Sequence, residues 1–204
     1  MRKIFVTGIG TDVGKTVVSA VLVEALQADY WKPIQTGSFY GTDTDKVQKL
    51  IGNDKSKFHS ERFLLEKYMS PHAAAELEGV QIKLEDFELP PTSNETLIIE
   101  GVGGIMVPLN KEHFVLDIIK KIDCEVLLVV QNYLGSINHS ILSLEVLRHH
   151  NINVIGTVFN GPKHQLSEEI ILHHSSFKFV GHINKEVQIT PEIISRYAEQ
   201  FKSI

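Results

Sequence analysis

The chain has 204 residues, a formal net charge of −5 at neutral pH and one cysteine, Cys124. A lone cysteine excludes a disulfide-stapled secreted domain and a zinc site built from several thiolates. The acidic balance, with no dense run of lysine or arginine, disfavours a non-specific nucleic-acid binder. An apolar fraction of 43% is too high for a disordered chain, so we expect one folded domain over residues 1–204.

The sequence predicts a cytoplasmic protein that does not contact a membrane. No stretch approaches the ~20 consecutive apolar residues of a membrane-spanning helix. The apolar start of the chain, residues 4–6, is too short for the core of a signal peptide and soon reaches a glycine.

Short apolar segments alternate with segments of helical spacing along the chain. The run VLLVV at 126–130 is apolar at every position, which is typical of a parallel strand buried on both faces. The alternation predicts a three-layer α/β fold with a doubly wound, mostly parallel sheet. Predicted strands cover residues 3–7, 30–34, 96–99, 125–130, 153–159 and 177–183, and predicted helices cover 15–28, 43–51, 71–78, 113–121, 136–149, 163–174 and 190–202.

The segment GIGTDVGKT at residues 8–16 joins the first predicted strand to the first predicted helix. In that position, backbone N–H groups of the loop and of the helix N-terminus can hold phosphate oxygens. Lys15 can reach the β- and γ-phosphates, and the Thr16 hydroxyl can ligate Mg²⁺. In the strict motif, four residues separate the first glycine from Gly-Lys-Thr. Here five residues separate Gly8 from Gly14. We predict a phosphate-binding loop that is one residue longer than the strict pattern.

Other polar residues follow predicted strands, at the sheet edge where ligands bind in open α/β folds. Lys32 would add a second cation beside a triphosphate, which suits phosphoryl transfer. Glu100 is expected to hold Mg²⁺, directly or through water. Asp43 and Asp45 precede a predicted helix, where an aspartate can serve as a cap or as a metal ligand. Asn160 lies where an amide could read a nucleotide base, although Asn-Gly is also a common turn.

Three further features bear on possible ligand or metal sites. The segment LGSINH at 134–139 opens a long predicted helix, whose free backbone N–H groups suit a carboxylate. Adjacent histidine pairs at 149–150 and 173–174 do not share a helix face, so a zinc site is not expected. Cys124 precedes a buried strand and is expected to be a packing residue.

Together these segments resemble those of the dethiobiotin synthetases, the ATP-dependent cyclo-ligases of biotin biosynthesis. The resemblance extends from Phe5 to around Gly181. It rests on motifs that occur in the family's order: the lengthened phosphate loop, KPIQTG at 32–37, SPH at 70–72, EGVGG at 100–104 and LGSINH at 134–139.

The resemblance implies a homodimer that uses Mg²⁺ and takes ATP as co-substrate. Such an enzyme converts 7,8-diaminononanoate and CO₂ to dethiobiotin, with release of ADP and phosphate. The intermediates would be a carbamate and a carbamic-phosphoric anhydride.

The resemblance also implies roles for individual residues. Catalytic roles fall to Lys15, Lys32 and Thr11. The implied substrate site comprises Thr11, Lys32, Thr36 and Gly103 of one subunit with Gly135, Ser136 and Asn138 of its partner. The implied Mg²⁺ ligands are Thr16, Asp45 and Glu100, with Asp43 as the alternative to Asp45. The implied nucleotide contacts are Gly10, Thr11, Asp12, Val13, Gly14, Lys15, Thr16, Val17 and Asn160.

Two positions depart from the family pattern. The segment GHIN at 181–184 replaces a Gly-x-Ile-Pro turn, which affects the expected base contacts at 182–188. Tyr133 stands where some relatives have lysine.

Three rival functions are weaker. The amidotransferases of cobalamin synthesis share the ATP fold but carry a glutaminase domain, for which this chain has no room. Partitioning or septum-positioning switch ATPases have a signature lysine early in their loop, and no lysine lies between Gly8 and Gly14. A non-catalytic nucleotide-binding module is disfavoured by Lys32 and Glu100.

Overall fold

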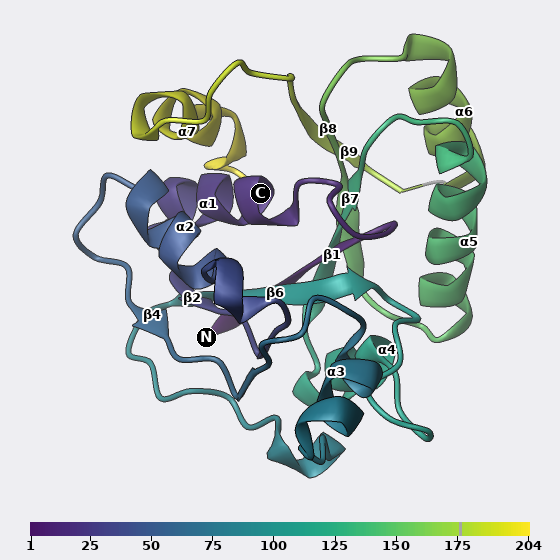
Figure 1. Ribbon diagram of the computed structural model, residues 1–204. Coiled ribbons are helices and arrows are strands. Elements are labelled where there is room, and N and C mark those ends of the chain that lie inside the picture. Colours follow the sequence, from purple (N-terminus) through teal and green to yellow (C-terminus); the bar gives the residue numbers. More distant parts are fainter. Residues whose placement is uncertain (176) are drawn as a thin grey trace.

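The computed structural model describes residues 1–175 and 177–204, and its centre is a seven-stranded parallel sheet (Figure 1). The strand order is β4-β2-β6-β1-β7-β8-β9, so the central strand β1 is followed in sequence by strands on both of its sides. The strands are β1 (Arg2–Gly8), β2 (Asp29–Trp31), β4 (Phe58–His59), β6 (Thr96–Gly104), β7 (Glu125–Val130), β8 (Val154–Asn160) and β9 (Phe179–Ile183). This architecture confirms the predicted doubly wound α/β fold.

Helices cover the sheet, with α1, α2 and α7 grouped together (Figure 1), while α3 and α4 both contribute side chains to one buried cluster. Helices α5 and α6 pack against each other beside β7, β8 and β9. The helices are α1 (Lys15–Leu26), α2 (Asp43–Leu50), α3 (Pro71–Glu78), α4 (Val115–Ile122), α5 (Ser136–His149), α6 (Gln165–Ser175) and α7 (Pro191–Ala198), with 3₁₀ turns at Ser38–Tyr40, Leu84–Asp86 and Glu199–Phe201.

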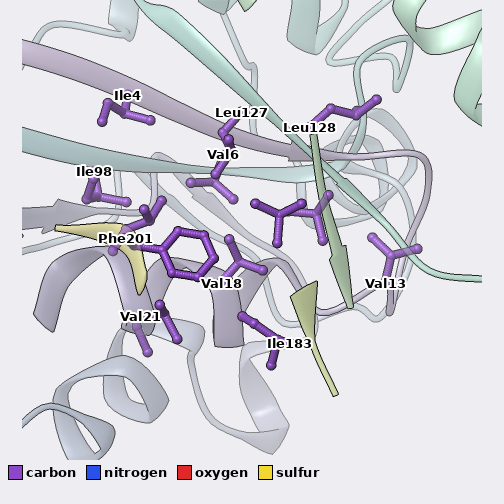
Figure 2. Close-up of a cluster of buried hydrophobic side chains, with 14 of the residues drawn as sticks. Ile4, Val6, Val13, Val18, Val21, Ile98, Leu127, Leu128, Ile183 and Phe201 are labelled. Carbon is purple, nitrogen blue, oxygen red and sulfur yellow. The ribbon is translucent and has the colours of Figure 1, made fainter. Parts of the chain in front are cut away.

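The two faces of β1 pack against different helices because side chains alternate along a strand. Ile4 and Val6 belong to a buried cluster that includes Val18 and Val21 of α1, as Figure 2 shows. Phe5, between them, belongs to a second cluster with Ile118 of α4. Burying both faces fixes β1, and therefore fixes where its following loop emerges.

Several predicted boundaries are wrong. The predicted strand 30–34 is broken at Pro33, which has no N–H to donate to a ladder. After it, β3 (Ile34–Gln35) pairs with β5 (Phe63–Leu64) in a separate two-stranded sheet. The sequence pattern did not predict β4 or β5, which are only two residues long. The strand predicted at 96–99 continues to Gly104, so Glu100 lies within β6 and not after it.

The structure also bears on the expectations about a membrane-spanning helix and about Cys124. None of the helices in the described part of the chain combines the length and apolarity that a bilayer crossing requires. Cys124 is buried, and burial raises the pKa of its thiol to about 12, so the group is neutral at physiological pH.

Candidate functional site

The loop between β1 and α1 lies at the carboxyl edge of the sheet. Gly14 has φ +94°, and a Cβ added there would lie 2.1 Å from the side-chain nitrogen of Asn160. Only glycine fits this position without strain or displacement. Asn160, the last residue of β8, donates from Nδ2 to the Val13 carbonyl at 3.1 Å. Asn160 therefore lies beside the loop, although it is 147 residues from Val13 in the sequence.

Lys32 is the centre of a buried ionic cluster. Its Nζ lies 2.7 Å from Oδ2 of Asp43 and 2.9 Å from Oε1 of Glu100. Burial acts to lower the pKa of Lys32, but Glu100 and Asp43 outweigh burial, and the net shift is upward. The Lys32 ammonium is therefore held in its charged form.

Glu100 also accepts two hydroxyl hydrogen bonds. Thr16 Oγ1 donates to Oε1 at 2.9 Å, and Tyr30 donates its phenolic hydrogen to Oε2 at 2.9 Å. Tyr30 is completely buried, and burial together with Glu100 raises its pKa well above the ordinary value. Both carboxylate oxygens of Glu100 are thus bonded, which fixes the group at the bottom of the site.

Lys15 is buried beside this cluster. Its Nζ donates to the Gly10 carbonyl at 2.8 Å, which folds the side chain back over the loop. Burial and the nearby charge of Lys32 lower the pKa of Lys15 to about 8. Two lysines and two carboxylates therefore share one site with a formal charge near zero.

The two candidate aspartates have different environments. Asp45 is exposed and completes a capping box with Thr42: its N–H donates to Oγ1 of Thr42, and its carboxylate accepts from the Thr42 N–H. Asp43 contacts Lys32 and Lys46. Burial acts to raise its pKa, but the two lysines outweigh burial and lower the pKa to about 2. Asp43, and not Asp45, therefore presents an ionised carboxylate beside Lys32.

A cavity of about 710 Å³ lies above the loop and the ionic cluster. It brings together most of the predicted residues, but Gly10, Val13, Val17, Asp45 and Asn160 do not line it. Tyr40 and Tyr68 line it although no sequence motif includes them, and Gln35 lines it although the KPIQTG motif gives it no role. The lining residues are Thr11, Asp12, Gly14, Lys15, Thr16, Lys32, Gln35, Thr36, Gly37, Tyr40, Gly41, Asp43, Lys46, Tyr68, Glu100, Val102 and Gly103.

The predicted carboxylate site at the start of α5 lies elsewhere on the chain. Gly135, Ser136 and Asn138 do not line the cavity. Gly135 and Asn138 are exposed, whereas Ser136 is buried. Leu134, directly before them, is fully exposed. The structure therefore leaves this helix start open to solvent.

The oxygen atoms at the base of the cavity suit Mg²⁺ better than a metal ion that is held by many protein side chains. Within the described residues, no three or more His, Cys, Asp or Glu side chains are grouped to hold a metal. The site instead offers a hydroxyl oxygen from Thr16 and carboxylate oxygens from Asp43 and Glu100. Mg²⁺ prefers such oxygens and takes its other ligands from phosphates and water.

The sequence matches a family model described as an AAA domain over residues 2–193. An ATP-dependent dethiobiotin synthetase BioD of Cytophaga hutchinsonii is 49% identical over 198 residues, covering 97% of this chain and 96% of the relative. A protein of the same name from Christiangramia forsetii is 46% identical, covering 98% of this chain and 96% of the relative. The chain belongs to the dethiobiotin synthetase family.

This membership confirms the predicted family. It also favours the predicted ATP-dependent synthetase over the alternative, a switch ATPase.

Similarity to solved structures shows the fold alone. The cell division ATPase MinD of Pyrococcus furiosus has a TM-score of 0.61 at 15% identity, covering 98% of each chain. A ParA family ATPase of Chlorobium tepidum has a TM-score of 0.56 at 10% identity, covering 97% of this chain and 98% of that one. The dethiobiotin synthetases and the switch ATPases therefore share the fold and are separated by sequence.

The departure from the dethiobiotin synthetase pattern at Asn184 has a structural consequence. The Asn184 N–H donates to the Tyr197 hydroxyl at 3.1 Å, a bond that proline could not make. Tyr197 in turn donates to Glu186 at 2.7 Å. His182, within β9, lies 2.9 Å from the Gly161 carbonyl through Nε2. Side chains therefore tie the start of the segment after β9 to α7, and tie β9 itself to the residue that follows β8.

Proposed function

We propose that this chain is an ATP-dependent dethiobiotin synthetase that acts as a cytoplasmic homodimer of single-domain subunits. It would join CO₂ to 7,8-diaminononanoate and close the ureido ring, with ATP as co-substrate. The observation that carries this proposal is the charged Lys32, buried between Asp43 and Glu100 in the cavity beside the phosphate loop. A second buried cation at that place suits a reaction in which charge moves between a phosphate and a carbamate.

The proposed chemistry needs no acid–base triad, because each amine releases one proton to solvent as it bonds to carbon. One amine of the diamine adds to CO₂ and gives a carbamate. A carbamate oxygen attacks the γ-phosphorus of ATP, ADP leaves, and a carbamic-phosphoric anhydride forms. The second amine then attacks the carbonyl carbon, and phosphate departs with the transferred oxygen. Positioning and charge stabilisation carry such a sequence.

The chain's own residues would act on these steps from fixed positions. Lys15 and Lys32 would stabilise negative charge on the phosphoryl group in transit, and Lys32 would also face the carbamate. Thr11, Thr36 and Gly103, which line the same cavity, would contact the substrate or the carbamate. The loop from Gly10 to Val17 would cradle the phosphates, and Asn160 would approach the adenine.

Thr16, Asp43 and Glu100 would hold Mg²⁺. The ion, when bound, would neutralise charge on the β- and γ-phosphates. Asp43 replaces Asp45 in this set because Asp43 lines the cavity, whereas Asp45 caps α2. The spacing of Thr42 and Asp45, a capping-box pattern, supports the same assignment.

Asp43→Asn should raise the Mg²⁺ concentration needed for half-maximal activity by about 10-fold or more, because an amide replaces a charged ligand. Asp45→Asn is the matched control, since asparagine keeps an acceptor for the Thr42 N–H. The Mg²⁺ dependence of product formation measures both variants. A larger shift for Asp45→Asn would reverse the assignment.

The affinity for metal-free ADP should fall as the pH rises above about 8. Lys15 binds phosphate as a cation, and its pKa in the free protein is about 8, so higher pH converts it to the neutral amine. Calorimetric titration with ADP and EDTA from pH 6.5 to pH 9.5 would measure this. Lys15→Arg, which stays charged, should flatten the profile. An unchanged slope in that variant would assign the pH dependence to another group.

The substrate carboxylate would be received by the partner subunit. The start of α5 leaves Gly135 and Asn138 exposed in one chain, with Ser136 buried between them, and a helix N-terminus suits an anion. An assay with the diamine, bicarbonate and MgATP, followed by mass spectrometry, tests the whole proposal. Dethiobiotin should form in equal amount to ADP. ATP hydrolysis that does not respond to the diamine would refute the proposed function.

A further inference from the structure

Tyr30 contacts Glu100, a proposed magnesium ligand, from the core side of the site, although no sequence motif includes Tyr30. Tyr30 lies in β2 and pairs in register with Ile98 of β6. Because side chains alternate along a strand, Ile98 and Glu100 point to the same face of the sheet. The long tyrosine ring therefore reaches from β2 along this face to the carboxylate of Glu100.

The contact divides the Glu100 carboxylate between two environments. Oε2 accepts from Tyr30 inside the core, whereas Oε1 accepts from Thr16 and Lys32 beside the cavity. Tyr30 and Glu100 are 0% and 1% exposed, so water does not replace the phenol as a donor. Without that donor, one carboxylate oxygen would be buried and unsatisfied, which favours rotation or displacement of the group.

We propose that Tyr30 is a positioning residue that orients Glu100 so that Oε1 faces the proposed Mg²⁺ site and the phosphates. This inference rests on the proposed function only in taking Glu100 as a magnesium ligand. Its physical basis is the general behaviour of metal sites, in which a hydrogen bond to the outer atom of a ligand fixes the ligand's orientation.

The test is the linkage between Mg²⁺ and ADP binding, which needs no turnover. Tyr30→Phe removes the hydroxyl and keeps the ring, which belongs to the same buried cluster as Ile98. The gain in ADP affinity on adding Mg²⁺ should shrink by about 10-fold, while the Kd of ADP in EDTA stays close to that of the wild type. Calorimetric titrations at a series of Mg²⁺ concentrations provide both values.

Two further variants make the result specific. Ile98→Val removes one methylene from the same buried cluster and should leave the Mg²⁺ linkage unchanged, although it also destabilises the core. Glu100→Gln should reduce the linkage, and adding Tyr30→Phe to it should cause no further loss, because the two residues act through one group. The double variant also separates an effect through Glu100 from a general loss of folding.

The possible outcomes are distinct. An equal loss of ADP affinity with and without Mg²⁺ in Tyr30→Phe would overturn the inference and make Tyr30 a packing residue. The inference would also be overturned if the double variant lost Mg²⁺ linkage by the product of the losses in the two single variants. If Mg²⁺ did not change the ADP affinity of the wild type, both the proposed metal site and the positioning role of Tyr30 would be refuted. If the wild type showed the linkage but made no dethiobiotin, the proposed function would fail and the positioning role of Tyr30 would stand.

Discussion

Lys32→Met should lower kcat for dethiobiotin formation by about 10²–10³-fold, the range found when a charge-stabilising donor is removed from an active site. The Kd of ADP should change far less, because Lys15 and the loop N–H groups hold the phosphates without Lys32. The separation arises because Lys32 is proposed to act on charge that develops during transfer. Steady-state kinetics and calorimetric titration with ADP measure the two quantities.

Lys49→Met is the control for this substitution. Lys49 lies on α2, the helix that carries Asp43, but it is exposed and does not line the cavity. Its removal changes the net charge equally and should leave kcat within about twofold, as is usual for surface substitutions. Thermal unfolding of both variants is required, since removing Lys32 takes the ion-pair partner from the buried Glu100 carboxylate, while Asp43 keeps its contact with Lys46. A folded Lys32→Met enzyme with weakened ADP binding and intact turnover would contradict the role.

Mixed dimers should recover activity from two variants that are each nearly inactive. Lys32→Met disables the cavity, and Asn138→Asp repels the substrate carboxylate from the start of α5. If each site combines a cavity from one subunit with a helix start from the other, a mixed dimer contains one intact site and one doubly altered site. Random pairing of equal amounts then gives about one quarter of wild-type activity, as expected for a two-fold interface.

The two variants must be combined by co-expression or joint refolding, so that subunits exchange. Each variant taken through the same procedure alone is the control and should remain nearly inactive. Sedimentation should show a dimer in every sample. Activity that stays at the sum of the separate variants would show that the cavity and the helix start do not form a site across subunits.

The sequence was sufficient for the fold because each prediction rested on local patterns that the structure preserves. The consecutive apolar residues at 126–130 predict a strand buried on both faces, and β7 is that strand. The glycine spacing of the loop predicts its place between β1 and α1. Boundaries failed where one residue decides them, as at Pro33, which ends the ladder of β2 and allows the separate β3–β5 pair.

The site was less predictable because tertiary contacts complete it. Motifs identified Lys15, Lys32 and Glu100, but the ion pairs of Lys32 with Asp43 and Glu100 depend on how the end of β2, β6 and α2 converge. The motifs leave Asp43 and Asp45 as alternative metal ligands, and the capping-box spacing from Thr42 to Asp45 is the one local signal that favours Asp43. Tyr30 carries no local signal, because its importance depends on a partner 70 residues away in the chain.

The most direct test follows oxygen from CO₂ into phosphate. The reaction is run briefly with freshly dissolved ¹⁸O-labelled CO₂, the diamine and MgATP, and the released phosphate and dethiobiotin are analysed by mass spectrometry. If ATP phosphorylates a carbamate in this site, each turnover places one ¹⁸O in phosphate and leaves one in the ureido carbonyl. Phosphate that contains only oxygen from ATP and water would show that the γ-phosphoryl group goes to water, and would contradict the proposed chemistry.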